Sequence, residues 1–245
     1  MSKVLSSSQI DEFTEKGFSR LSGGFPRSIA DRTSLEICGQ LGVSFHRPHT
    51  WQRPFLRLEE NLDGQVMEAV TPRVTAAFRQ LVGRRYRPLH QLGWWPVSFP
   101  GFGDATVGSW HVDGTFHHRA RLSAQGLLPL FLFSDVVAGG TLIAPGSHRV
   151  AARILHEHEP HGLSPNEMSG AVRKAVDVAT AEEANGEAGD VILCHPLVLH
   201  AANPNRSNNP RVMANPRVGL TRPARDRGFH LSPVEVVLRE ARPAA

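Results

Sequence analysis

Apolar residues in the first third of the chain recur at the spacing of an α-helix. Between positions 29 and 41 they form a broad apolar stripe made of Ala30, Leu35, Ile37, Cys38 and Leu41. Two further stretches carry helix signals: Ser8 is a candidate N-cap ahead of a stop at Gly17, and Pro72 suits a first helical turn. The pattern therefore predicts helices at residues 8–16, 29–41 and 70–81.

After residue 88 the chain changes to short apolar runs separated by Gly and Pro, which is typical of strands. The predicted strands are residues 89–99, 109–113, 127–135, 141–144, 191–195 and 212–220. No internal repeat, low-complexity tract or linker divides the chain. We therefore predict one domain over residues 1–245, with a helical N-terminal part at 1–88. Its core at 89–245 is predicted to be mainly β with supporting α-helices.

Residues 150–187 interrupt the strand pattern. Ser164-Pro165-Asn166-Glu167 signals the start of a helix. The polar run before it contains His156, Glu157, His158, Glu159 and His161, which we interpret as a solvated surface. A long insertion inside a compact domain is usually functional or mobile, so a lid role for 150–187 remains a hypothesis.

The composition is that of a soluble globular protein, with 40% hydrophobic and 20% charged residues. No run of eighteen apolar residues occurs, so we expect no membrane association. The N-terminus lacks the apolar core of a secretory signal. Cys38 and Cys194 are too few for a disulfide framework or a four-thiolate zinc site. We therefore expect a cytoplasmic protein.

The sequence pI of about 9.7 comes mainly from arginine, because the chain has few lysines. Arg84, Arg85 and Arg87 form one cluster, and a second is made of Arg222, Arg225, Arg227, Arg239 and Arg242. A surface that follows phosphates needs a denser stripe with stacking aromatic residues. We interpret both clusters as solvated surface and expect no nucleic-acid partner. A nucleic-acid-binding module, the alternative, would bind in a salt-sensitive way without the metal site.

The most informative local motif is His111-Val112-Asp113. On a strand, residues two apart point to the same face, so His111 and Asp113 would project together. Two imidazoles and one carboxylate form the facial triad that binds non-haem Fe(II) and leaves positions open for substrate and oxygen. The third ligand must come from elsewhere in the chain. His148, His195 and His200 compete for this role, and Pro196 prevents the strand alternation from deciding among them.

Longer motifs around these residues resemble a known family. They are Gly139-Gly140-Thr141-Leu142-Ile143-Ala144-Pro145-Gly146-Ser147-His148-Arg149, the stretch from Gly189 through His200 to Asn205, and the following Arg211, with an opening at residues 5–18. Together they resemble the phytanoyl-CoA dioxygenase family of Fe(II)/2-oxoglutarate-dependent oxygenases, most weakly at residues 30–87. The resemblance implies a double-stranded β-helix, which is a cupin-like jelly-roll.

The resemblance also implies the ligand set and the co-substrate site. The spacing of eleven residues between His200 and Arg211 matches the family, so His111, Asp113 and His200 are expected to bind Fe(II). Arg211 would bind the distal carboxylate of 2-oxoglutarate through its planar fork. Its competitors are Arg217, which has the same strand parity, and Arg206.

One position departs from the family pattern. The family often has a hydroxyl residue two positions after the distal histidine, and this chain has Ala202 there. Thr141 is a possible replacement donor to 2-oxoglutarate. Ser98 or Gln91 could approach the oxo-acid end of the same molecule.

The reaction implied by the resemblance is hydroxylation of a C–H bond in a small-molecule metabolite, such as a natural-product intermediate, with O2 consumed and succinate and CO2 released. Asp113 argues against halogenation, since halogenating relatives carry a small residue there. Desaturation, cyclisation and epimerisation stay open, as does a non-catalytic metal-binding jelly-roll. A monomer or a homodimer is expected. Residues that could meet the substrate are Trp94, Trp95, Phe99, Phe102, Trp110, His117, His118, Arg119 and Arg121.

Overall fold

The computed structural model describes residues 3–104, 108–113, 120–122 and 126–242. Ten strands lie in this part of the chain: β1 Phe18–Leu21, β2 Phe55–Leu58, β3 Trp95–Ser98, β4 His111–Val112, β5 Leu128–Leu132, β6 Val136–Ile143, β7 Glu182–Gly186, β8 Val191–Cys194, β9 Leu199–Ala201 and β10 Arg211–Ala214. The six α-helices are α1 Ser7–Lys16, α2 Arg27–Gln40, α3 Pro72–Val82, α4 Ser147–Glu157, α5 Pro165–Ala175 and α6 Pro233–Glu240.

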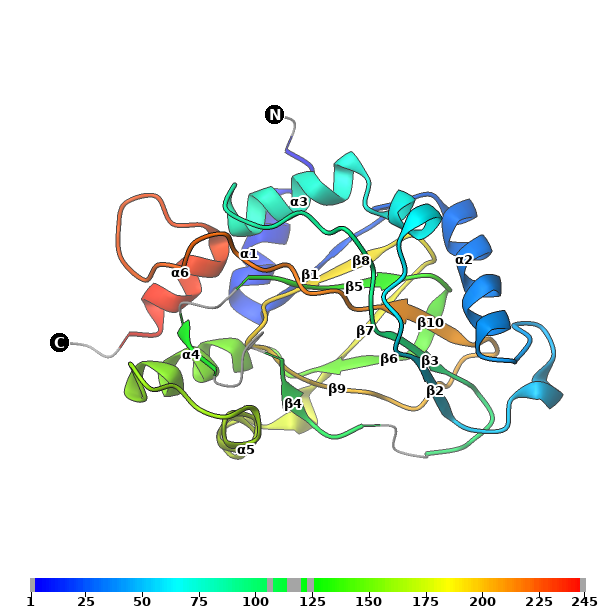
Figure 1. Ribbon diagram of the computed structural model, residues 1–245. Helices are drawn as coiled ribbons and strands as arrows, with labels where there is room; N and C mark the ends of the chain where they lie inside the picture. Colours follow the sequence, from blue (N-terminus) through cyan, green and yellow to red (C-terminus); the bar gives the residue numbers. More distant parts are fainter. Residues whose placement is uncertain (1–2, 105–107, 114–119, 123–125, 243–245) are drawn as a thin grey trace.

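The strands form two antiparallel sheets that lie face to face (Figure 1). The order is β1-β8-β5-β10-β3-β2 in the six-stranded sheet and β4-β9-β6-β7 in the four-stranded sheet. Apolar side chains from both sheets pack in one interior cluster, which includes Leu130 of β5, Ile192 of β8, Met213 of β10 and Ile143 of β6. This architecture confirms the predicted jelly-roll with supporting helices.

Strand β5 shows why the sheet is covered on both sides. All five of its residues are buried. Leu130 and its neighbours two positions away point into the space between the sheets, whereas Phe131 packs with residues of the helical layer. A strand without polar alternation is typical of a sheet whose two faces are both buried.

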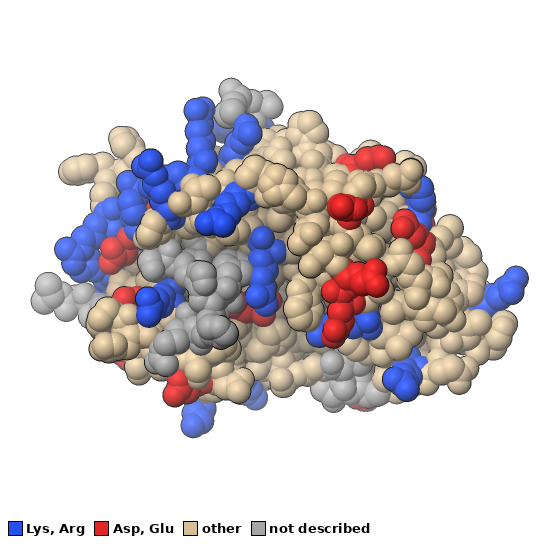
Figure 2. All heavy atoms as spheres, in the orientation of Figure 1, with Lys and Arg blue, Asp and Glu red and all other residues tan. Residues whose placement is uncertain are grey.

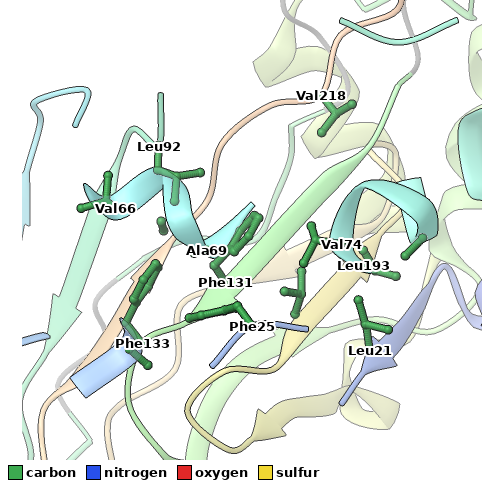
Figure 3. Packing of buried hydrophobic residues seen from close by; sticks show 14 of the residues in the cluster. Leu21, Phe25, Val66, Ala69, Val74, Leu92, Phe131, Phe133, Leu193 and Val218 are labelled. Atoms are coloured by element: carbon green, nitrogen blue, oxygen red, sulfur yellow. The ribbon is translucent and has the colours of Figure 1, made fainter. Parts of the chain in front are cut away.

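The helical layer lies on the outer face of the six-stranded sheet. Figure 3 shows Phe131, Phe133 and Leu193 of this sheet region packed with Phe25, Val74 and Leu92. Helix α3 begins at Pro72, as predicted, and buries Val74, Phe78 and Leu81. Thr71 caps it by accepting a hydrogen bond from the N–H of Val74. Burial of this layer supports the sheet whose inner face carries Arg211.

The N-terminal part, which was predicted to be helical, also contributes two strands. Strands β1 and β2 lie within residues 1–88 and form the two edges of the six-stranded sheet. Strand β2 is half-exposed, so its sequence lacks the apolar alternation that marks a strand with one buried face. The N-cap of α1 is Ser6 and not Ser8, because the hydroxyl of Ser6 accepts from the N–H of Gln9.

Several predicted strands are shorter in the structure than in the sequence analysis. Strand β10 ends at Ala214, two residues before Pro216, and β3 begins only at Trp95. Strands β7 and β9 were not predicted at all. Both are short, and β9 begins three residues after Pro196, where the alternation of the preceding run is lost.

Within residues 150–187, helices α4 and α5 pack behind the four-stranded sheet, and β7 forms one edge of that sheet. Met168 and Val172 of α5 contact a cluster that contains Val112 of β4 and Leu199 of β9. Since Val112 points away from the face of His111, α5 lies on the opposite side of the sheet from that histidine. This placement differs from the lid hypothesis. Two histidines of the polar run are also hydrogen bonded: His156 Nε2 lies 2.8 Å from the carbonyl of Leu238, and His158 Nδ1 lies 2.8 Å from that of Ile154.

The fold brings the two arginine clusters together. The N–H of Arg87 donates to the carbonyl of Gly219, and the N–H of Thr221 donates to the carbonyl of Arg85, both at 2.8 Å. Figure 2 shows most of the basic side chains of the face in view on its left side, and acidic side chains on both sides. No helix in the described part of the chain has both the length and the apolar character needed to cross a membrane.

Two buried histidines predict how stability depends on pH. His148 Nε2 donates to the carbonyl of Thr14 at 3.1 Å, and its ring centroid lies 5.2 Å from that of His195. Burial lowers the pKa of His148 to about 4, against the opposing effect of the Thr14 carbonyl. Burial, followed by the charge of His148, lowers the pKa of His195 well below its usual range. Both rings therefore stay neutral when folded at pH values where the unfolded chain takes up protons.

We expect the free energy of unfolding to fall as the pH drops from about 6.5 toward about 4, by roughly 3 kcal/mol for His148 alone. Urea denaturation between about pH 7 and pH 5 measures the upper part of this change. His148→Gln should flatten the pH dependence, whereas the exposed control His90→Gln should not. Equal slopes for the two variants would contradict this assignment.

Candidate metal centre and co-substrate pocket

Pairing of β4 with β9 brings together two histidines that are far apart in the sequence. The strands are antiparallel, and His111 lies directly opposite His200. Directly opposed residues of an antiparallel pair point to the same face of the sheet. Asp113 follows the end of β4, and its carboxylate reaches the same space as the two rings.

The three side chains surround a gap of the size of a small cation. The Nε2 atom of His111 lies 3.8 Å from Oδ1 of Asp113, and Nε2 of His200 lies 3.8 Å from Oδ2. One ligand atom from each residue lies within 4.8 Å of the others. These distances are too long for direct hydrogen bonds, so the three groups converge without satisfying one another. This donor set of two imidazoles and one carboxylate fits Fe(II).

Backbone carbonyls orient both rings in the same way. Nδ1 of His111 lies 2.8 Å from the carbonyl of Ser109, and Nδ1 of His200 lies 3.1 Å from that of Val198. A ring that donates through Nδ1 leaves the lone pair of Nε2 free. Each Nε2 lone pair therefore faces Asp113, as metal-binding histidines require.

The two histidines differ in their exposure. The side chain of His200 is 8% exposed and that of His111 is 44% exposed, so the centre opens to solvent on the β4 side. Burial lowers the pKa of His200, although the charge of Asp113 opposes this and His111 adds to it. The neutral imidazole, which is the form that binds a metal, is therefore favoured.

Arg211 and Ser98 face the same interior from the other sheet. Met213 of β10 packs between the sheets, and Arg211, two residues earlier, shares its face. Ser98 lies directly opposite Arg211 in the pairing of β3 with β10. Arg211 and Ser98 are therefore cross-strand neighbours that point toward the sheet of His111 and His200. Ser98 thus lies beside the expected anchor of the distal carboxylate, and not at the oxo-acid end where the sequence analysis put it.

Both residues carry buried polar atoms without a partner among the described residues. These atoms are Nη1 of Arg211 and Oγ of Ser98. Burial lowers the pKa of Arg211 to about 10, with Glu183 opposing the shift. A buried guanidinium donor that lacks a partner is costly, and a carboxylate is the group that satisfies it best. The pair is suited to hold an anionic molecule.

Thr141 also lies on the face of the candidate centre. Ile143 of β6 pairs with His200 of β9, so Thr141, two residues earlier, shares the face of His200. Continuing this register by two residues places Thr141 opposite Ala202, which is the position where the hydroxyl residue is missing. The side chain of Thr141 is buried.

The other candidates lie away from this centre. Gln91 is exposed and, together with Arg217, lines a separate cavity. Arg206 is exposed and pairs with Asp104 at 3.3 Å and Glu183 at 3.5 Å. His148 and His195 pack against each other near Thr14 and Phe13 of α1.

The aromatic candidates are mostly core residues. Trp95 and Phe99 belong to the core cluster of the helical layer, Phe102 packs against it, and Trp110 packs against the cluster beneath α4 and α5. Trp94 is the exception, because 44% of it is exposed. Arg121 is exposed, and His117, His118 and Arg119 lie outside the described residues.

Ser169 is a supporting residue that the sequence analysis missed. Its hydroxyl on α5 accepts a hydrogen bond of 3.1 Å from the N–H of Val112, the residue between His111 and Asp113. Strand β4 is the edge of its sheet, so this N–H would otherwise have no strand partner. No sequence signal identifies Ser169, because the contact joins residues 57 positions apart.

A comparison with protein-family models identifies the family. The model described as phytanoyl-CoA dioxygenase (PhyH) matches residues 32–213, which is well over half of the chain. The chain belongs to the phytanoyl-CoA dioxygenase (PhyH) family. This confirms the resemblance inferred from the motifs. The residues that carry the candidate centre, together with Arg211, lie within the PhyH match. No curated protein sequence matches the chain.

Solved structures share the fold of this PhyH-family chain. The non-haem α-ketoglutarate-dependent carbocyclase SnoK from nogalamycin biosynthesis is 18% identical, with a TM-score of 0.58 over 88% of this chain and 84% of SnoK. The epimerase SnoN, in complex with Fe3+, α-ketoglutarate and nogalamycin RO, is 17% identical, with a TM-score of 0.59 over 87% and 82%. EctD from S. alaskensis is 20% identical, with a TM-score of 0.57 over 89% and 78%.

Loss of the Ser169 hydroxyl should remove a hydrogen bond that holds β4, the strand of His111, against α5. We expect Ser169→Ala to weaken Fe(II) affinity by about fivefold, since one hydrogen bond contributes about 1 kcal/mol. Ser169→Thr, which keeps the hydroxyl, should restore the affinity. Anaerobic titration calorimetry measures the change, with the exposed Ser28→Ala as control. Equal affinities for Ser169→Ala and Ser28→Ala would remove Ser169 from the supporting structure.

Proposed function

We propose that this protein is an Fe(II)- and 2-oxoglutarate-dependent oxygenase that oxidises a C–H bond of a small-molecule metabolite. His111, Asp113 and His200 would hold the iron, and Arg211 the far carboxylate of 2-oxoglutarate. The observation that carries the proposal is the arrangement of unsatisfied groups around one interior. Two Nε2 lone pairs and a carboxylate converge from one sheet, and a buried guanidinium donor faces them from the other.

The protein side of the reaction follows from these positions. Bound Fe(II), 2-oxoglutarate and O2 together supply an oxidant strong enough to take hydrogen from a C–H bond, with succinate and CO2 as by-products. Arg211 orients the co-substrate through paired hydrogen bonds, and Ser98 donates beside it. Thr141 would contribute the hydroxyl that Ala202 lacks. Ser98, Thr141 and Arg211 are buried, so their contacts with the co-substrate would be strengthened by the low local dielectric.

Hydroxylation is the outcome that we propose. Asp113 fills the position that a halide would need, which supports oxygen transfer over halogenation. Similar structures include a carbocyclase and an epimerase, so cyclisation and epimerisation are the alternative outcomes of the same hydrogen abstraction. Among these neighbours, one is bound to nogalamycin RO and another, HygX from Streptomyces hygroscopicus, to hygromycin B. They support a free small molecule as substrate.

Anaerobic titration of the metal-free protein with Fe(II) and then 2-oxoglutarate tests the proposal. The chelate of the two gives a weak visible charge-transfer band, which we expect in the wild type. Asp113→Ala and His200→Ala should each abolish the band, because three ligands are needed to hold the ion in place. The exposed His90→Ala serves as a matched control that should keep it. A folded wild-type protein that binds iron without forming the band would exclude the co-substrate assignment.

Arg211 should lower the stability of the ligand-free protein and increase its affinity for 2-oxoglutarate. Arg211→Met removes a buried and incompletely paired charge, so we expect the thermal midpoint of the ligand-free protein to stay level or rise. In the wild type loaded anaerobically with Fe(II), 2-oxoglutarate at about 100 times its Kd should stabilise the fold by about 3 kcal/mol. Arg211→Met should lose most of this gain, and the exposed Arg222→Met should keep it. Full stabilisation of Arg211→Met by 2-oxoglutarate would exclude Arg211 as the anchor.

A further inference from the structure

A second cavity lies at the other end of the two strands that carry Ser98 and Arg211. Its volume is about 470 Å³, within the range of small-molecule sites. The residues that line it are Asn61, Pro88, Leu89, His90, Gln91, Gly93, Trp94, Pro216 and Arg217. The N–H of Asn215 donates to the carbonyl of Trp94 at 3.3 Å, which joins the end of β10 to the start of β3 beside this cavity.

Trp94 occupies an unfavourable backbone conformation in this cavity. Its φ angle is +59°, and it is the one residue other than glycine with positive φ in the described part of the chain. Bulky residues rarely adopt this region, and such conformations concentrate at functional sites. Trp94 is nevertheless 44% exposed, so its side chain is only partly packed against the protein. A strained and exposed tryptophan is better explained by binding than by packing.

The indole of Trp94 contacts a neighbouring cation. The guanidinium carbon of Arg57 lies 5.1 Å from the centre of the Trp94 ring, at the distance of a cation–π contact. Trp94 lines the cavity, whereas Arg57 does not. Asn61 packs closely against Gly93 beside the indole. A side chain at position 93 would overlap Oδ1 of Asn61, so this contact requires glycine unless the Asn61 side chain moves.

The lining has the charge of an anion site. Arg217 supplies a cation, and Asn61, His90 and Gln91 supply polar groups, whereas none of the described lining residues is acidic. A flat indole favours stacking with a planar group, and a guanidinium favours a carboxylate or phosphate. Gln91, which the sequence analysis gave as a possible neighbour of the oxo-acid end of 2-oxoglutarate, lines this cavity instead.

We propose that this cavity binds a planar, negatively charged small molecule, with Trp94 stacking on the ring and Arg217 pairing with the anionic group. Trp94 directly precedes β3, the strand that ends at Ser98. The proposal does not rest on the oxygenase function, because binding in the cavity requires neither iron nor 2-oxoglutarate.

The test is titration calorimetry of the full-length protein without added iron, using 2-naphthoate as the probe and uncharged 2-naphthalenemethanol as its match. We expect 2-naphthoate to bind and the alcohol to bind more weakly. Trp94→Gly should raise the Kd for 2-naphthoate by about tenfold and Arg217→Gln by about threefold. The control variants Phe229→Ala and Arg227→Gln, an exposed aromatic residue and an exposed arginine outside the cavity, should leave it unchanged.

Thermal denaturation provides an independent measurement. Glycine adopts positive φ without strain, so Trp94→Gly should melt no lower than the wild type. A lower midpoint would mean that Trp94 is retained for packing and would count against the proposal. So would the absence of 2-naphthoate binding, equal affinity for the alcohol, wild-type affinity in Arg217→Gln, or displacement of the probe by 2-oxoglutarate. The visible iron band reports on the oxygenase proposal separately, so the two can fail independently.

Discussion

The candidate centre depends on the register of one short antiparallel pair. Because β4 and β9 align His111 with His200, both imidazoles reach the same face, and Asp113 joins them by strand alternation. A shift of one residue would turn His200 to the outer face and put Leu199 or Ala201 in its place. The pair is only two residues long, so its register must be set by its surroundings. Val112 and Leu199 help to set it by packing against the cluster beneath α4 and α5.

The second sheet adds what the first lacks. Arg211 and Ser98 reach the interior from strands whose outer faces are covered by the helical layer. Both residues are buried, so their polar atoms can form few hydrogen bonds with water. In this setting an anion that enters between the sheets gains strongly from each contact. The jelly-roll therefore separates two tasks: one sheet presents the ligand atoms, and the other presents a desolvated cation.

Local patterns in the sequence predicted the parts that depend on neighbouring residues. The alternation around Val112 placed His111 and Asp113 on one face, and helix signals at Pro72 and Ser164 located two helices. The choice of His200 over His195 needed the family spacing, because Pro196 breaks the alternation between them. Strand β2 was not predicted, because it is an edge strand without a buried face and its sequence therefore lacks a regular alternation of apolar and polar residues. Ser169 and the cavity at Trp94 arise from contacts between distant segments, which no local periodicity encodes. Gln91 shows the same limit, since it lines the cavity at Trp94 and its sequence position alone did not indicate this.

The unequal burial of the two histidines has a kinetic consequence for the proposed ion. His200 is nearly enclosed, whereas His111 stands at the solvent side of the centre. Of the three residues that would hold the ion, His111 is the one that a chelator in solution could reach most readily, and His200 the least. Access to the centre would then be from the β4 edge. A free imidazole in solution could occupy the place of a missing His111 side chain, and the enclosed position of His200 would remain closed to it.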